Sequence, residues 1–191
     1  MARNKRNQVY VVYVGHVTKP TIFFSWAEAH PRVIEYNGAD HENFPNLDEA
    51  LKSMAQRNIS DFDVTPECTR AWDSVPQSKK GLSYYAVAYG KTTGVFETWE
   101  ETKKAVNGFS SACFQKFDTE CEAQKFIEIW QDTYIKVCMA VIAKKLRHGW
   151  LPCDLAFNTS SLVISPGILN SETELAADLA RMGLGDYGGN K

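Results

Sequence analysis

The side chains best suited to bind a metal ion or to act as nucleophiles are the histidines and cysteines. They are His16, His30, His41, His148, Cys68, Cys113, Cys121, Cys138 and Cys153. Zinc sites use close pairs such as C-x₂₋₄-C and H-x₃₋₅-H, and neither spacing occurs here. A P-loop and a G-x-S-x-G motif are also absent. We therefore expect no metal, no cofactor and no enzymatic activity.

Composition sets the class of protein. A chain of 191 residues, 44% apolar and 23% charged, suits one or two small soluble domains. The five cysteines form an odd set without close pairs, which indicates reduced thiols in the cytoplasm or nucleus. No apolar run reaches the roughly 18 residues of a membrane helix. The net charge is −2, but residues 79–147 hold 11 Lys and Arg against 8 Asp and Glu.

The middle of the chain has the pattern of one small folding unit. Runs of aromatic and β-branched residues at 85–89, 95–98 and 113–117 predict three short strands. Gly90 and Gly94 bound the segment between the first two runs. Because glycine accepts positive φ at little cost, we expect a turn there.

Two helices complete this unit. Thr98 precedes two glutamates and predicts a capped helix, which Gly108 ends. The second helix follows Asp118 or Thr119, and no Gly or Pro interrupts it from there to His148. Its apolar residues at helical spacing include Ile127, Trp130, Tyr134, Val137 and Val141. This apolar stripe is too broad for a three-stranded sheet to cover, so the helix packs on the rest of the chain or forms a homodimer interface through Thr119–His148.

An internal repeat is visible in the spacing of aromatic residues and glycines. A tyrosine stands five residues before a glycine in both halves, and a tryptophan stands 18 residues before a phenylalanine. The matched pairs are Tyr10 with Tyr85, Gly15 with Gly90, Trp26 with Trp99 and Phe44 with Phe117. Residues 10–54 are therefore expected to fold as a second copy of the central unit.

The central unit resembles a known family. Its order of Tyr, Gly, Gly-Val-Phe, Thr-Trp, Phe-x-Lys-Phe and Thr-Glu-x-Glu-Ala, over about 42 residues, is similar to the hybrid-binding domain at the N-terminus of eukaryotic ribonuclease H, the caulimovirus viroplasmin domain. The resemblance implies an α+β fold with two repeats of a small three-stranded antiparallel sheet and two helices. We expect repeats at 8–57 and 84–148, a linker at 58–83 and a C-terminal segment with a short helix at 149–191.

The resemblance also implies a function and a site. The family binds RNA/DNA hybrids or double-stranded RNA through the groove and the phosphates, and it is not catalytic. By the same resemblance, Trp99 and Phe114 lie against the sugar–phosphate backbone, Lys91 and Lys116 pair with phosphates, and Tyr85 belongs to the same site. Other lysines, at positions 79, 80, 103 and 104, are expected to be solvated surface charges.

The first copy differs from the second at the positions that, by the resemblance, contact the nucleic acid. His41, Glu42 and Asn43 stand where the second copy has Phe114, Gln115 and Lys116. A carboxylate in that position repels a phosphate backbone, so we expect the first copy to keep the fold without the site. A second hypothesis is that the repeated fold serves self-association or holds a small apolar or aromatic ligand between the copies.

Overall fold

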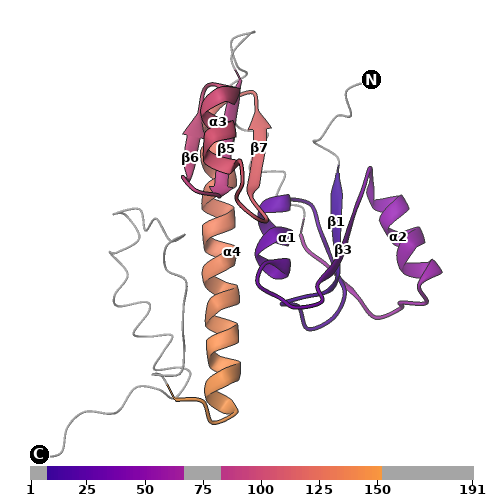
Figure 1. The fold of residues 1–191 in the computed structure, drawn as a ribbon. Helices are drawn as coiled ribbons and strands as arrows, with labels where there is room; N and C mark the ends of the chain where they lie inside the picture. The colour runs from indigo at the N-terminus through magenta and orange to yellow at the C-terminus, as the bar shows by residue number, and fades with distance from the viewer. Residues whose placement is uncertain (1–7, 67–82, 152–191) are drawn as a thin grey trace, which may run out of the picture. The chain divides into compact units, whose positions relative to one another are not determined.

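The computed structural model describes residues 8–66 and 83–151 (Figure 1). The predicted C-terminal helix and most of the predicted linker lie outside these residues. The first described part contains β1 (Val9–Val14), β2 (Thr21–Phe23), α1 (Trp26–Val33), β3 (Asp40–Phe44), α2 (Leu47–Gln56) and β4 (Asp63–Val64). The second contains β5 (Tyr84–Tyr89), β6 (Gly94–Phe96), α3 (Trp99–Val106), β7 (Cys113–Phe117) and α4 (Glu120–Arg147).

The two parts repeat one topology, which confirms the α+β fold with two copies. The sheets have the orders β3-β1-β2-β4 and β6-β5-β7, with the first strand of each copy between its two antiparallel partners. Each central strand shifts register at the same place, between Val12 and Val14 in copy 1 and between Val87 and Tyr89 in copy 2. A shared irregularity of this kind is typical of a conserved bulge in a repeated unit.

The first sheet has one strand more than predicted. β4 pairs parallel to β2, with Thr21 opposite Asp63, inside the stretch that its composition assigned to the linker. Lys19 fixes this strand, because its ammonium lies 2.8 Å from an Asp61 oxygen and 3.1 Å from an Asp63 oxygen. The hydroxyl of Thr65 then donates to the Ile22 carbonyl.

Gly15 and Gly90 occupy the same position in the two copies and are needed for space. A Cβ on Gly90 would lie 2.9 Å from the Ala105 carbonyl oxygen, and one on Gly15 would overlap the Arg32 carbonyl. This corrects the prediction that Gly90 supplies a positive φ: Gly94 does so, with φ +146°. The close approach lets the backbone N–H of the next residue donate to an equivalent helix carbonyl in each copy. His16 donates to the Arg32 carbonyl at 2.6 Å, and Lys91 donates to the Ala105 carbonyl at 2.8 Å.

Each helix begins at a polar cap. The side chains of Ser25, Asn46, Thr98 and Thr119 accept a hydrogen bond from a backbone N–H in the first turn of their helices. Thr119 and His148 bound α4, as the absence of helix breakers predicted. No helix in the described residues is long and apolar enough to cross a membrane.

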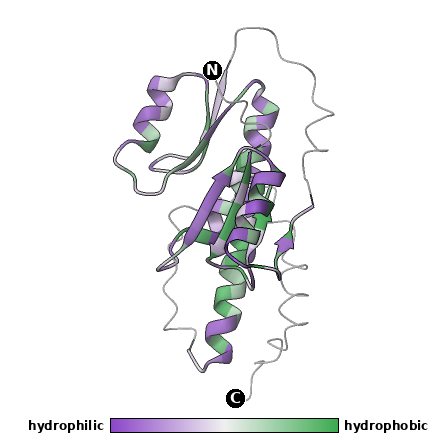
Figure 2. Ribbon diagram, turned by 90° about the vertical axis from the view of Figure 1, so that its right-hand side faces the viewer, coloured by the Kyte–Doolittle hydropathy of each residue, from purple (hydrophilic) through white to green (hydrophobic). Residues whose placement is uncertain are grey.

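The sheet of copy 1 lies between two helices. On one face Val9, Val11 and Ile22 pack with Ala50 and Met54 of α2. On the other, Val12 and Phe23 pack with Ala29 of α1. Figure 2 shows β1 in the hydrophobic colours and its neighbour β3 in the hydrophilic ones, as expected for a central and an edge strand.

Candidate nucleic-acid interface

Strand register brings three of the predicted site residues to one face of the second sheet. Tyr85 lies opposite Lys116, and Val87 lies opposite Phe114. Residues directly opposite each other, and residues two apart on a strand, share a face. Phe117 is three residues from Phe114 and therefore faces the other side, where its ring lies 5.3 Å from Phe126 of α4.

Trp99 joins these residues from the start of α3. Its ring centroid lies 5.8 Å from that of Tyr85 and 6.0 Å from that of Phe114. The Lys116 ammonium lies 5.8 Å from the centre of the Tyr85 ring. Trp99 is 45% exposed and Phe114 is 38% exposed. We call Tyr85, Trp99, Phe114 and Lys116 the aromatic face of copy 2, a set of open rings with one cation beside them.

A capping box holds Trp99 in place. The Thr98 hydroxyl accepts from the Glu101 N–H at 3.3 Å and donates to the Glu101 carboxylate at 2.8 Å. The Thr102 hydroxyl, fully buried, donates back to the Thr98 carbonyl at 2.8 Å. These bonds fix the backbone of the first turn of α3 on both sides of Trp99.

Lys91 lies apart from the aromatic face. The backbone N–H of Lys91 donates to the Ala105 carbonyl. Its ammonium lies close to Gly108, 3.6 Å from the point that a Cβ on this glycine would occupy. Both contacts are at the C-terminal end of α3, whereas Trp99 begins that helix. The structure thus brings four of the five predicted residues together and places the fifth at the far end of α3, about 12 Å away at 1.5 Å per residue.

Copy 1 builds a matching group of rings. Trp26 begins α1, and its ring lies 5.2 Å from Tyr10 and 5.4 Å from His41, which stacks on it. Asn43 lies opposite Tyr10, where copy 2 has Lys116 opposite Tyr85. The first copy therefore keeps the geometry of the face, with a histidine for a phenylalanine and an amide for the ammonium.

The contact between the copies is one of the two arrangements predicted for α4, packing on the rest of the chain, but the part played by His30 was not predicted. α1 packs against α4, and His30 of α1 is 2% exposed beneath Trp130 and Tyr89. The burial predicted for Trp130, Tyr134 and Val137 is confirmed, since each is at most 5% exposed. The packing partner is copy 1, while a homodimer through α4 stays a prediction. The one signal in the sequence was that His30 lies a helical turn after Trp26.

Other reactive side chains are dispersed. Within residues 8–66 and 83–151, no three His, Cys, Asp or Glu side chains gather as a metal site requires. Cys113, Cys121 and Cys138 are free thiols. Burial raises the pKa of the Cys113 thiol well above its usual value, so this group stays protonated and unreactive at neutral pH.

Comparison with known proteins places both copies in one family. The family described as "Ribonuclease H1 N-terminal domain" matches residues 8–52 and 83–127. Ribonuclease H1 of Homo sapiens is 50% identical over 44 residues, which are 23% of this chain and 15% of that protein. Ribonuclease H of Schizosaccharomyces pombe is 43% identical over 44 residues, 23% and 17% of the two chains. Ribonuclease H of Crithidia fasciculata is 36% identical over 52 residues, 27% and 10% of the two chains.

These relatives extend well beyond the match, since the chain spans between 10% and 17% of their lengths. The first matched segment contains β1, β2, α1, β3 and the start of α2, and the second contains β5, β6, α3, β7 and the start of α4. The matched bulges, capped helices and ring groups described above are shared by both segments. Residues 8–52 and 83–127 are therefore two tandem segments that each match the family described as "Ribonuclease H1 N-terminal domain".

Proposed function

We propose that this chain is a non-catalytic nucleic-acid-binding protein whose second copy binds a duplex containing an RNA strand, either an RNA/DNA hybrid or double-stranded RNA. The observation that carries the proposal is the aromatic face of copy 2. Trp99 and Phe114 expose their rings side by side, and Lys116 places its charge next to them. Similarity to the N-terminal domain of ribonuclease H1 supports the same function.

The chemistry of the face fits a nucleic-acid backbone. Lys116 supplies the charge that pairs with a phosphate and releases its counterions, which makes binding depend on salt. The flat faces of Trp99 and Phe114 offer apolar contact to sugars or bases. In the shallow minor groove of an RNA-containing duplex, the 2′-hydroxyl separates RNA from DNA, and the Tyr85 hydroxyl is a polar group on this face.

Lys91 extends the contact along the duplex. It lies at the C-terminal end of α3, about one eight-residue helix length from Trp99. Duplex DNA carries about one charge per 1.7 Å of its axis, so a second phosphate is within reach at that separation. We propose that Lys116 and Lys91 bind different phosphates at the two ends of α3.

Charge favours copy 2 over copy 1 as the binding unit. Asn43 of copy 1 has no charge where Lys116 stands, whereas the Glu42 carboxylate, expected to repel phosphates, faces the other side of the sheet and lies beside Arg57. Residues 79–147, which contain copy 2, hold three more basic than acidic residues, whereas the whole chain has a net charge of −2. A duplex is therefore attracted to the second copy and repelled by the rest of the chain.

The test compares duplexes of one sequence by fluorescence anisotropy at low salt. We expect the hybrid or the double-stranded RNA to bind more tightly than double-stranded DNA. Phe114→Ala should cost about 1–3 kcal/mol if the ring is a stacking platform, and Lys116→Ala should also weaken binding. The matched variants His41→Ala and Asn43→Ala, at the same positions in copy 1, should bind like the wild type.

Failure to bind hybrid or double-stranded RNA at micromolar protein would contradict the proposal. Equal losses for the copy 1 and copy 2 variants would contradict the assignment to copy 2. The alternative functions, self-association or a small ligand between the copies, have less support, because the rings of His30, Tyr89 and Trp130 pack directly on one another at the junction.

A further inference from the structure

Equivalent positions on α1 and α3 have different surroundings. Both helices begin with a tryptophan, and one turn later copy 1 has His30 where copy 2 has Lys103. His30 is 2% exposed, and its ring is covered by Tyr89 and Trp130 of copy 2. Lys103 is exposed. The helix stripe that begins at the tryptophan is thus buried by the other copy in α1 and open in α3.

Both ring nitrogens of His30 bind copy 2. The Trp130 indole N–H donates to Nδ1 at 3.0 Å, and Nε2 lies 2.7 Å from the Ser111 carbonyl oxygen. Because an indole N–H is a donor and a carbonyl is an acceptor, the neutral ring must carry its proton on Nε2. A buried side chain with both polar atoms satisfied from another unit is a specific contact, and losing it leaves buried groups unpaired.

Tyr10, the β1 residue in the ring group of copy 1, also lies near copy 2. Burial raises the pKa of Tyr10 to about 12, and Cys113 of copy 2 is the nearby group that adds to the rise. Trp26 is half-buried, whereas Trp99 is 45% exposed. In the ring group of copy 1, Tyr10 therefore lies near copy 2 and Trp26 is partly covered, while the equivalent aromatic face of copy 2 is open.

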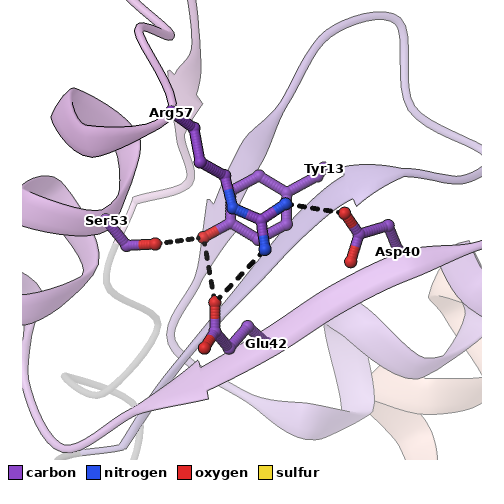
Figure 3. A network of polar contacts seen from close by, with 5 residues as sticks. All are labelled: Tyr13, Asp40, Glu42, Ser53 and Arg57. Carbon is purple, nitrogen blue, oxygen red and sulfur yellow. Dashed lines mark hydrogen bonds and ion pairs between the residues drawn. The ribbon is translucent and has the colours of Figure 1, made fainter.

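The surface of copy 2 that receives α1 has a polar counterpart in copy 1. Around Tyr13, Arg57 stacks at 3.7 Å from the ring centre and bonds Asp40 at 2.7 Å (Figure 3). The Tyr13 hydroxyl lies 2.7 Å from the Ser53 hydroxyl, and Glu42 lies 3.6 Å from the Arg57 guanidinium.

The matching positions of copy 2 are mostly apolar. Trp130 stands for Arg57, Cys113 for Asp40, Phe126 for Ser53 and Ala88 for Tyr13. All four of these copy 2 residues are at most 1% exposed. The same side of the repeat therefore forms an apolar receptor in copy 2 and a charged, solvated surface in copy 1.

We infer that copy 1 is an intramolecular docking unit: its helix α1, through His30, binds the Trp130 surface of copy 2, and each chain presents one nucleic-acid face instead of two. Such a head-to-tail contact would repeat from chain to chain if α3 of copy 2 could also dock and the Arg57 side of copy 1 could also receive a helix. It ends here because copy 1 carries Arg57 in place of Trp130, and copy 2 carries Lys103 in place of His30. The count of one nucleic-acid face rests on the proposed function, whereas the docking contact does not.

The experiment uses the full chain and follows the indole N–H of Trp130 by NMR hydrogen exchange. His30→Ala removes its acceptor, and we expect its exchange to accelerate at least tenfold. Lys103→Ala, the matched change at the open position of α3, should leave the exchange rate unchanged. His30→Gln offers one acceptor and one donor, so it should lie between the two and remains usable if His30→Ala does not fold.

Stoichiometry supplies the second readout, from titration of the wild type with a short RNA/DNA hybrid. We expect an end point of one duplex per chain. Unchanged Trp130 exchange in both His30 variants would overturn the docking inference, and an end point of two duplexes would overturn the single face. If no duplex binds, the proposed function fails while the exchange rates still decide the docking contact.

Discussion

His30 makes the stability of this chain depend on pH in a way that can be calculated. Its ring is 2% exposed and bonded through both nitrogens in the neutral form. Burial, opposed by the bond to the Ser111 carbonyl and helped by nearby His41, lowers its pKa from 6.5 to about 4. The other groups that face it are the rings of Trp26, Tyr89 and Trp130 and the Ser111 carbonyl, and none of these offers a negative charge to an imidazolium.

The direction in which stability changes with pH follows from which state, folded or unfolded, protonates His30 more readily. The unfolded chain protonates this histidine below about pH 6.5, whereas the folded chain resists until about pH 4. Stability is therefore complete above pH 6.5, falls between pH 6.5 and 4, and levels off below. At about 1.4 kcal/mol per pKa unit, the loss is about 2 kcal/mol at pH 5 and about 3.4 kcal/mol in full.

Urea unfolding of the wild type and of His30→Gln, at pH 7.5 and pH 5, measures this loss. The carboxylates and His16 titrate in both proteins and cancel in the difference. We expect the stability advantage of the wild type over His30→Gln to shrink by about 2 kcal/mol between the two pH values. An advantage that is the same at both pH values would refute the burial of a neutral His30 between the copies.

Three further substitutions test the packing at Trp130 and the turns at Ser111 and Gly38. Trp130 is fully buried and bonds His30, so Trp130→Ala should lower the free energy of unfolding by about 3–5 kcal/mol, and an unchanged melting temperature and oligomeric state would contradict this. Ser111 has φ +58°, and its equivalent in copy 1 is Gly38 with φ +78°. Ser111→Gly should therefore stabilise the chain by about 0.5–1 kcal/mol, and Gly38→Ser should destabilise it by a similar amount; urea midpoints that move the other way would show that neither turn is strained.

Spacing in the sequence was sufficient to predict the repeats. Trp26 and Trp99 each begin a helix directly after a polar cap, as the matched intervals required. The extent of α4 was also predictable, because local capping and the absence of Gly and Pro decide it. Strand alternation is local information and puts Phe114 and Lys116 on one face of β7. Tyr85 joins them only because β5 pairs with β7 across β6 and α3, an arrangement that the family resemblance implied.

What the sequence did not show depends on contacts between distant residues. The pairing of β4 with β2 joins residues about 40 positions apart, and no local pattern in Asp63–Val64 marks a strand. His30 and Trp130 are 100 residues apart, so the broad apolar surface of α4 was visible, but the sequence left its partner open between the rest of the chain and a second chain. Even so, an alignment of the two copies contains the clue, since Lys103 and Arg57 are charged where their counterparts His30 and Trp130 are buried.

The most direct test of the central claim is the salt dependence of hybrid binding by the wild type, Lys116→Ala and Asn43→Ala. If Lys116 binds a phosphate, its removal should reduce the slope of log K against log salt concentration by roughly 1. Asn43→Ala, at the equivalent position of copy 1, should keep the wild-type slope. A Lys116→Ala slope equal to that of the wild type would contradict the aromatic face of copy 2 as the nucleic-acid interface.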